Sequence, residues 1–389
     1  MKNKLKILYV VNHAAFFVSH RLPIALAARD QGFSIDLITG QAGSPSMEVL
    51  TAAKLKEANL HHQRIAFTSG GLNPVTELMG LIQLIYQVNK IQPEIIHCIS
   101  PKGIIYGGLA ARFTKTKNLV LAISGMGFAF TKGNSSNQFR DLLSRIYTLI
   151  FAFILKHPNI RVIVQNDDDR RTVIEMGLDS NKIVLIPGSG VKLEKLVNLD
   201  IEAKSPIVLL PARMLWDKGV GDFIEAARQL KSLMPKWRFI LAGAADYQNP
   251  TSVPIGLLEG LNVKQIIEWV GHVDDMTPYF SAASIVCLPS YREGMPKCLL
   301  EGAAAGCAIV TTDTVGCREA ILPEVSGLLV PVRDGVALKN ALYLLMNNRD
   351  LRESFGRSGR KLAIDKFGLD AVIKSTLSIY RDLLNHEQK

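Results

Sequence analysis

Residues 284–306 read SIVCLPSYREGMPKCLLEGAAAG, and this stretch contains the pattern that decides the fold. Its first seven residues form a mostly apolar run, which is typical of a strand buried within a parallel sheet. A loop containing Gly294 follows, and Pro296 is well placed as an early helix residue. A strand, a loop and a helix in this order form the repeating unit of doubly wound α/β domains.

The same alternation extends over the chain in both directions. Twelve apolar runs predict strands, with helical patterns between most of them: KILYVV, SIDLIT, EIIHCIS, NLVLAIS, RVIVQ and KIVLIP in the first half, and PIVLLPA, RFILAG, IIEWVG, SIVCLPS, CAIVTTD and GLLVPV in the second. A polar stretch near residues 190–206 interrupts the pattern. We therefore expect two doubly wound domains, residues 1–195 and 205–365. The final helical pattern, residues 366–389, follows no strand and is expected to pack back on the first domain.

Composition agrees with a globular protein that has two cores. The chain has 389 residues, of which 48% are hydrophobic and 21% charged, so disorder is disfavoured. Its five cysteines form no CxxC pair, and we expect small core residues in a reducing compartment. The short apolar run after the first lysines predicts an opening strand rather than a signal peptide. No apolar run is long enough to predict a transmembrane helix.

The positive charge is concentrated in the first half of the chain. Residues 1–200 hold 23 Lys/Arg and 14 Asp/Glu, a balance of 23−14=+9, whereas the whole chain has +10. This imbalance favours an anionic partner, either a phospholipid surface or a phosphorylated substrate. No basic motif interleaved with aromatic residues indicates nucleic acid. The alternative is that the charge serves only solubility.

Two acids flank the start of the helix predicted in the opening stretch. Glu293 falls in the loop and Glu301 in the second helical turn. Gly294 allows the backbone to approach a ligand closely, and the N–H groups of a helix start favour an anion such as a pyrophosphate. The alternative is one capping acid and one surface acid without a ligand.

In its long form this segment, S-Y-x-E-G-x-P-x-x-L-L-E-x-x-A-x-G, resembles the signature of retaining glycosyltransferase family 4. The flanking segments, residues 269–290 and 308–332, also resemble that family. The resemblance implies the GT-B fold, in which two Rossmann-like domains face a cleft. It also implies that Glu293 contacts the transferred sugar and Glu301 the nucleotide ribose. The neighbours Gly294, Met295 and Pro296 would line the donor nucleotide-sugar site.

A second candidate motif is PARMLWDKGVGDFIEAA, residues 211–227. Arg213 and Lys218 lie between a predicted strand and a predicted helix, and the R-x4-K-G pattern is similar to the diphosphate-binding segment of the family. Two cations there would neutralise phosphate charge as the sugar–phosphate bond breaks. The alternative is a pair of solvated surface cations. Arg213, Lys218 and Glu293 are therefore the predicted catalytic residues.

Acceptor residues are predicted in the first half. In NHAAFFVSHRLPIALAARDQG, residues 12–32, Ser19 or a neighbour is expected to cap a helix, which gathers His13, His20 and Arg21 near the first strand's carboxyl end. Three segments resemble a branch of the family that builds bacterial surface polysaccharides and lipid-linked oligosaccharides. They are FFVSHRLPIA within this stretch, ISPKGIIYGGLAARF and ISGMGFAFTK. The resemblance implies that Arg21 and Lys102 meet the pyrophosphate of a polyprenyl-linked sugar. The alternative for each is a structural salt bridge.

One position departs from the family. Many relatives have H-x-H at the end of the third predicted strand, with the second histidine beside the reacting sugar, whereas this chain has Ile99 there. His97 and His13 are the remaining candidates for that role, and His97 is also among the predicted acceptor residues. Asp167–Asp169 contain D-x-D, the metal motif of another glycosyltransferase fold, but Asn166 before them predicts a helix start. We expect that no cofactor or metal is required.

Together, these features predict a retaining glycosyltransferase that moves a sugar from a nucleotide sugar, UDP-linked, to a polyprenyl-pyrophosphate-linked acceptor. We expect an enzyme of surface-polysaccharide synthesis that is peripheral on the inner face of the cytoplasmic membrane. The sugar is a hexose or an N-acetylhexosamine, with N-acetylgalactosamine as first choice by analogy. The alternatives are a GT-B enzyme with a soluble acceptor, an epimerase, or a non-catalytic scaffold. The oligomeric state is open.

Overall fold

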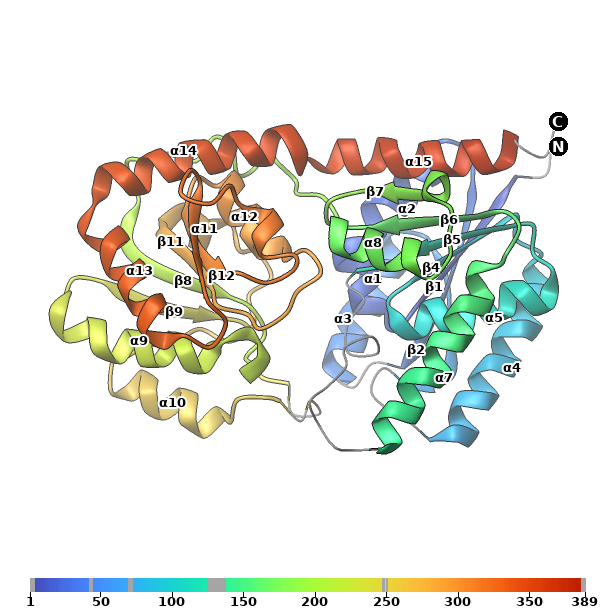
Figure 1. Cartoon of the computed structure of the whole chain (residues 1–389), viewed down its shortest axis with the longest axis horizontal. Coiled ribbons are helices and arrows are strands. Elements are labelled where there is room, and N and C mark those ends of the chain that lie inside the picture. The colour runs from blue at the N-terminus through green and yellow to red at the C-terminus, as the bar shows by residue number, and fades with distance from the viewer. Residues whose placement is uncertain are drawn as a thin grey trace. The chain divides into compact units, whose positions relative to one another are not determined.

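The computed structural model describes residues 4–41, 45–68, 73–124, 138–246, 249 and 251–385. The chain divides into two compact units. The first comprises Met1–Ser189 and Val372–Lys389, and the second comprises Gly190–Ala371. Each unit contains one parallel sheet with helices on both faces (Figure 1), so the predicted fold class of two doubly wound domains is confirmed.

The first unit is built on a sheet of seven strands in the order β3-β2-β1-β4-β5-β6-β7. Every neighbouring pair is parallel. The strands are β1 (Lys6–Val11), β2 (Ser34–Gln41), β3 (His61–Thr68), β4 (Ile95–Ile99), β5 (Asn118–Ala122), β6 (Ile160–Val164) and β7 (Ile183–Leu185). The chain order reverses between β1 and β4, so the topological switch point lies between the carboxyl ends of these strands.

Successive residues of β1 enter two different cores, as in a strand that is buried on both faces. Leu8 and Val10 face α4, α5 and α7, whereas Ile7, Tyr9 and Val11 face α1, α2, α3 and α15. The helices of this unit are α1 (Ala14–His20), α2 (Leu22–Asp30), α3 (Pro45–Glu57), α4 (Pro74–Ile91), α5 (Pro101–Thr114), α7 (Gln138–Leu155), α8 (Asp167–Glu175) and most of α15 (Leu369–Asn385).

The second unit repeats this arrangement with six parallel strands in the order β10-β9-β8-β11-β12-β13. The strands are β8 (Ser205–Pro211), β9 (Arg238–Ala242), β10 (Glu268–Trp269), β11 (Ala283–Leu288), β12 (Ala308–Thr312) and β13 (Gly327–Val330). One face packs against α9 (Val220–Leu233), α10 (Ile255–Val263) and α13 (Gly335–Asn347), and the other against α11 (Thr277–Ala282), α12 (Lys297–Ala304) and α14 (Arg349–Lys366). Its switch point lies between β8 and β11.

The twelve predicted strands are all present, but the sequence analysis missed β3. This strand lies at the edge of its sheet, and it alternates buried Ile65 and Phe67 with the exposed or half-buried His61, Arg64 and Ala66. An edge strand does not need a continuous apolar run, because it is covered less completely than a central strand. The missed strand therefore carried too weak an apolar signal.

The helix start predicted at Ser19 or an adjacent residue is wrong, because α2 begins at Leu22. The structure has a separate short helix, α1, before α2, and the His13 side chain caps it by accepting a hydrogen bond from the backbone N–H of Phe16. The N-cap of α2 is Arg21, whose side chain makes no capping bond, although Pro23 lies in the first turn as expected. The hydroxyl of Ser19 instead donates to the Phe16 carbonyl oxygen.

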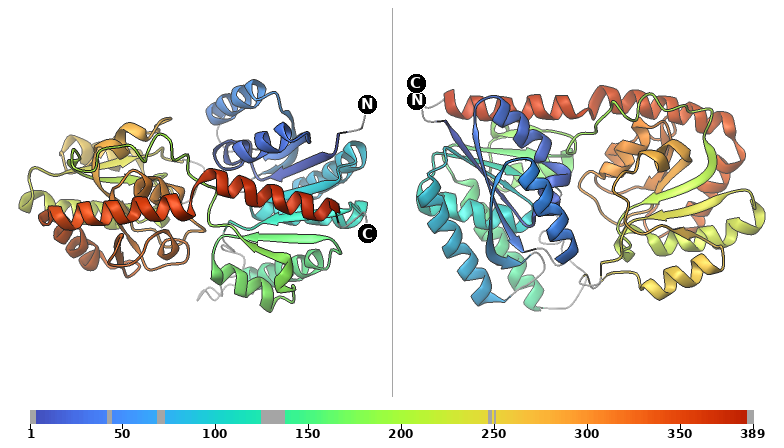
Figure 2. Two further views of the ribbon diagram at one scale, coloured as in Figure 1. Left: turned by 90° about the horizontal axis from the view of Figure 1, so that it is seen from above. Right: turned by 180° about the vertical axis from the view of Figure 1, so that it is seen from behind.

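Helix α15 packs on the sheet of the first unit, where Val372, Leu377, Tyr380 and Leu383 enter the same core as Tyr9 (Figure 2).

The cysteines are core residues as predicted: Cys98, Cys287, Cys307 and Cys317 are buried free thiols, and Cys298 is partly buried. The ISGMGFAFTK segment from Gly125 onward lies outside the described residues.

Candidate active site at the switch point of the second unit

The loops that follow β8 and β11 meet at the switch point of the second sheet. Lys218 lies at the end of the first loop and Glu293 in the second, and the Nζ of Lys218 is 2.5 Å from the Oε1 of Glu293. The two side chains are 23% and 12% exposed. Two of the residues predicted to be catalytic are therefore in direct contact, in a partly sheltered position.

Backbone contacts hold these two loops together. The carbonyl oxygen of Asp217 accepts hydrogen bonds from the N–H of Tyr291 at 2.9 Å and the hydroxyl of Ser290 at 3.1 Å. Gly219 has φ 72°, and a Cβ there would lie 2.0 Å from the carbonyl oxygen of Pro289. A glycine is thus required both by its left-handed conformation and by the close approach of the other loop.

The loop after β12 closes against the same place. Gly316 has φ 82°, and a Cβ there would lie 2.2 Å from the carbonyl oxygen of Gly294. The hydroxyl of Thr312 donates to the carbonyl oxygen of Ser290. The sequence analysis missed Gly316, whose only signal was its place in a loop that follows a strand.

Two helices begin at these loops without a side-chain cap. The N-cap residues are Gly219 for α9 and Pro296 for α12, and neither provides a capping side chain. The first N–H groups of a helix lack intrahelical partners and carry partial positive charge, so they favour an anion. With Lys218, they make this edge of the sheet suited to a diphosphate.

Arg213 forms an ion pair with a different acid, in another loop. Its guanidinium is 57% exposed and lies 3.0 Å from a carboxylate oxygen of Asp246, in the loop after β9. That loop passes close to the first loop, since a Cβ on Gly243 would lie 1.8 Å from the carbonyl oxygen of Ala212. No pattern in the sequence pointed to Asp246.

Glu301 lies in the second turn of α12, as predicted. Its carboxylate is 3.3 Å from the Nζ of Lys297. Burial raises the pKa of Glu301, and the Lys297 ammonium opposes that rise. Met295 packs on the apolar core beneath α12. Pro296 is the N-cap residue of α12.

Tyr291 supports the Glu293 loop from another side, and the sequence analysis gave it no role. The guanidinium of Arg333 lies 4.7 Å from the centre of its ring. Burial and the neighbouring Asp222 carboxylate raise the pKa of Tyr291. Burial also raises the pKa of Asp222, although its hydrogen bond with Tyr291 acts against this rise.

In the first unit, His13 and His20 lie on the short helix α1, directly after β1. The Nδ1 of His13 accepts the capping hydrogen bond, so in the neutral ring the proton resides on Nε2. The ring of His20 stacks on Phe16 with centroids 4.3 Å apart. Both histidines are partly exposed.

Arg21 and His97, which were predicted to meet the acceptor, are interior side chains. His97 is fully buried, and its Nδ1 is 2.6 Å from the hydroxyl of Tyr380, which also bonds the Tyr9 hydroxyl at 2.8 Å. Arg21 is 3% exposed beside the same tyrosines. Burial lowers the pKa of His97 and, to a lesser degree, that of Arg21. In this structure neither side chain is available to an acceptor.

Lys102 forms the structural salt bridge that was its alternative interpretation. Its Nζ lies 2.8 Å from a carboxylate oxygen of Glu77 on α4, and Tyr106 donates its hydroxyl proton to the same carboxylate. Ile99 is buried in the core at the end of β4. His97, two residues earlier on the same strand, is fully buried as well.

The D-x-D aspartates form the first turn of α8, as predicted. The Asn166 side chain caps the helix by accepting a hydrogen bond from the N–H of Asp169 at 2.7 Å. Among the described residues, no three His, Cys, Asp or Glu side chains form a group that could hold a metal ion.

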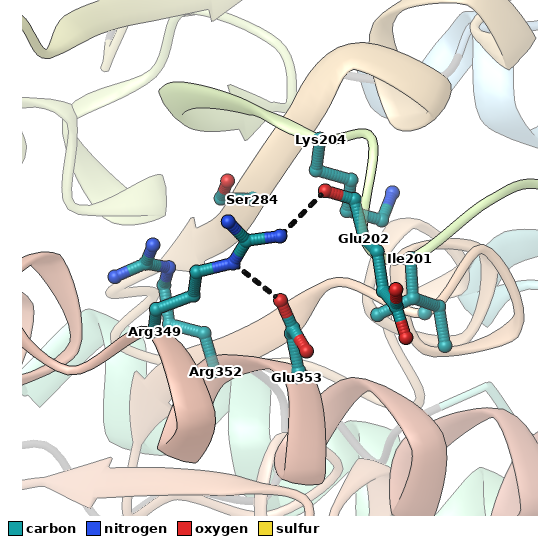
Figure 3. A pocket seen from close by; sticks show the side chains of 8 residues that line it. Ile201, Glu202, Lys204, Ser284, Arg349, Arg352 and Glu353 are labelled. Atoms are coloured by element: carbon teal, nitrogen blue, oxygen red, sulfur yellow. Dashed lines mark hydrogen bonds and ion pairs between the residues drawn. The ribbon is translucent and has the colours of Figure 1, made fainter.

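A hollow on the second unit lies away from these loops, at the edge of the sheet where β8, β11 and β12 begin (Figure 3). Its cations are engaged with the protein itself. Arg349 pairs with Glu353 and donates to the Glu202 carbonyl oxygen, and Lys204 donates to the carbonyl oxygen of Phe280. Arg352 donates to Leu345 and Met346. The contacts around this hollow connect helix α14 to the chain that leads into β8.

The fold and these motifs define a glycosyltransferase, and comparisons with known proteins agree. Residues 6–158 match the family described as "Glycosyl transferase 4-like", and residues 192–362 match "Glycosyl transferases group 1". The two models together cover most of the chain, which therefore belongs to the glycosyltransferases that they describe and has the GT-B fold.

Several of its bacterial relatives are named for acceptors that are linked to undecaprenyl diphosphate. The chain is 29% identical over 385 residues (95% of this chain, 97% of the relative) to the N,N'-diacetylbacillosaminyl-diphospho-undecaprenol alpha-1,3-N-acetylgalactosaminyltransferase of Campylobacter jejuni. It is 24% identical to the UDP-Gal:alpha-D-GlcNAc-diphosphoundecaprenol alpha-1,3-galactosyltransferase of Escherichia coli, covering 80% and 81% of the two chains. Among solved structures, sucrose-phosphate synthase from Thermosynechococcus elongatus shares the fold, with a TM-score of 0.79, 20% identity and 99% and 100% coverage.

Proposed function

We propose that this protein is a retaining glycosyltransferase that transfers a hexose or an N-acetylhexosamine from a UDP-sugar to a polyprenyl-diphosphate-linked acceptor. The observation that carries this proposal is the Lys218–Glu293 pair between two helix starts without side-chain caps. The names of the two bacterial relatives support the donor nucleotide, the lipid-linked acceptor and N-acetylgalactosamine as the first sugar to test.

The proposed roles follow the charge that develops during transfer. Lys218, Arg213 and the first N–H groups of α9 and α12 stabilise the leaving diphosphate. The Glu293 carboxylate accepts hydrogen bonds from hydroxyls of the transferred sugar, and Glu301 accepts them from the ribose. The acceptor hydroxyl attacks the anomeric carbon from the face that the diphosphate leaves, through an ion-pair-like transition state, so the anomeric configuration is retained. The bond from the anomeric carbon to the diphosphate oxygen breaks, and that oxygen takes the hydroxyl proton as UDP departs.

We propose that the first unit binds the acceptor, with His13 and His20 as its contacts. These two histidines are partly exposed and follow the carboxyl end of β1, where ligands of doubly wound sheets bind. The enzyme would work at the inner face of the cytoplasmic membrane, in the synthesis of a surface polysaccharide.

The test is a panel of UDP-sugars scored for UDP release with a polyprenyl-diphosphate-linked sugar as acceptor. Glu293→Gln should lower kcat about 100-fold or more, because a contact to the reacting sugar is lost. Asp274→Asn, at an exposed acid of the same unit, is the matched control and should leave turnover unchanged. Unchanged turnover of a folded Glu293→Gln variant would remove the central claim, and UDP release with soluble acceptors alone would favour the soluble-acceptor alternative.

A separate prediction concerns metal. We propose that the protein's own cationic groups stabilise the diphosphate, so excess EDTA should leave the rate of UDP release within about twofold of its value. The control is the same assay with added Mg²⁺. A rate that EDTA abolishes and Mg²⁺ restores would show that a metal is required.

A further inference from the structure

Helix α4 is apolar on two opposite faces, of which one is covered. Gly80, Leu84 and Val88 are buried against the sheet. The other face is exposed and follows helical spacing, with side chains between 51% and 67% exposed: Val75, Leu78, Met79, Ile82 and Tyr86. A helix that is apolar all round is normally buried on all sides. The open face of α4 therefore points to a partner.

Helix α7 presents a second apolar stripe on the same layer. Phe151 and Ile154 face the core, whereas Ile146, Leu149 and Phe153 are between 40% and 70% exposed. Helix α5 lies between α4 and α7 and contacts both (Figure 1). It adds Phe113, which is 59% exposed. We call these nine exposed residues of α4, α5 and α7 the apolar face.

The charges around the apolar face are positive. Exposed or partly exposed cations occur on the same helices and at their ends: Lys90, Arg112, Lys115, Arg145 and Lys156. The Arg112 guanidinium lies 4.5 Å from the centre of the Phe153 ring, so a cation is placed directly against the apolar stripe. Among the side chains that the structure describes on these three helices, Glu77 is the only acid. It is mostly buried and forms an ion pair with Lys102.

We infer that the apolar face is a docking surface for an anionic lipid bilayer. Exposed apolar residues enter the headgroup boundary while the surrounding cations meet lipid phosphates, as in other helices that lie on membranes. No helix in the described part of the chain is long and apolar enough to cross a bilayer. The inference deepens the proposed function, on which it rests for its purpose, because a polyprenyl-linked acceptor is held in a membrane.

Vesicle flotation tests this surface without any substrate. The full chain is mixed with phosphatidylcholine vesicles that contain either no phosphatidylglycerol or about a third of it. We expect binding to the anionic vesicles at low salt and little binding to the neutral ones, since each lysine or arginine near an anionic surface adds roughly a fivefold gain in partition. Ile82→Glu with Leu149→Glu should weaken binding about tenfold or more, because two apolar contacts become charges that the vesicle repels.

Matched controls use the second unit. Val336→Glu with Leu344→Glu changes two exposed apolar residues of α13 and should leave binding unchanged. Lys90→Gln with Arg145→Gln should weaken binding, whereas Lys361→Gln with Lys366→Gln on α14 should not.

Wild-type binding by the Ile82→Glu/Leu149→Glu variant would overturn the inference. So would a wild-type dimer that this variant dissociates, because a second copy would then cover the face. UDP release with a detergent-solubilised acceptor should persist in this variant, which separates a failed docking surface from a failed chemistry.

Discussion

Lys218 and Glu293 come from loops 75 residues apart in the chain and form an ion pair between two helix starts. An exposed ion pair contributes little to stability, but this pair is mostly shielded from water. Each charge therefore holds the other side chain in place. Such an arrangement keeps a cation ready for a phosphate group and a carboxylate ready for a sugar hydroxyl.

Replacing Lys218 tests the diphosphate role. Lys218→Ala should weaken UDP binding about tenfold or more, which corresponds to about 1.4 kcal/mol, because a charge-assisted contact to phosphate is lost. Titration calorimetry with UDP measures the change. Lys361→Ala, at an exposed lysine of α14, is the control and should bind UDP as the wild type does. Unaltered UDP affinity in Lys218→Ala would clear this residue of its role.

At the scale of elements, the second unit brings the loops that follow three of its strands together at the carboxyl edge of its sheet. The loop after β11 is touched on one side by the loop after β8 and on the other by the loop after β12. Each contact includes a close approach of two backbones at a glycine in the left-handed region, Gly219 or Gly316. The position of Glu293 is thus set by its neighbours as well as by its own loop.

Gly316→Ala should therefore disturb both stability and turnover. A left-handed conformation costs a non-glycine residue about 1–2 kcal/mol, and the new Cβ would also press on the Gly294 carbonyl oxygen. We expect a loss of at least about 1 kcal/mol in urea unfolding, and a lower kcat for UDP release.

The control for this change is Gly260→Ala in α10, where a Cβ meets nothing within 4 Å. Alanine is the better helix former by about 0.8–1.0 kcal/mol, so this variant should be as stable as the wild type or more so. If Gly316→Ala behaved like Gly260→Ala, the close approach of the two loops would be refuted.

At the scale of the whole molecule, α15 is the last element of the chain, yet it completes the core of the first unit. Its Tyr380 hydroxyl bonds both Tyr9 on β1 and His97 on β4. Arg21 lies beside these tyrosines, and its Nε, like the Nε2 of His97, is buried without a hydrogen-bond partner. Burial holds His97 neutral, because a second positive charge beside Arg21 in the interior would be costly.

This cluster predicts how stability depends on pH. The pKa of His97 is lowered in the folded state, so below about 6.5 the unfolded chain takes up a proton that the folded chain does not. His97 thus makes the free energy of unfolding fall as pH decreases below that value, by up to about 1.4 kcal/mol per pH unit.

Urea unfolding between pH 7 and 5 checks this expectation. His97→Asn removes the titrating group and should make the pH dependence shallower, although the variant is less stable at pH 7. An unchanged slope in His97→Asn would contradict the assignment.

Several features of this protein could be predicted from local sequence alone. The strands buried on both faces read as continuous apolar runs, and the segment around Glu293 and Glu301 is a contiguous motif whose loop and helix follow from Gly294 and Pro296. The edge strand β3 and the helix α1 escaped because their signals are short or alternating. The sequence by itself therefore determined the fold class and the family.

Only the tertiary structure decided which candidate side chains remain accessible. Arg21, His97 and Lys102 looked alike in sequence as polar residues near strand ends, but burial under α15 and pairing with Glu77 make them structural. The contacts of Arg213 with Asp246 and of Gly316 with Gly294 join segments far apart in the chain. Burial and pairing depend on what packs against a residue from elsewhere, and a local pattern does not contain that information.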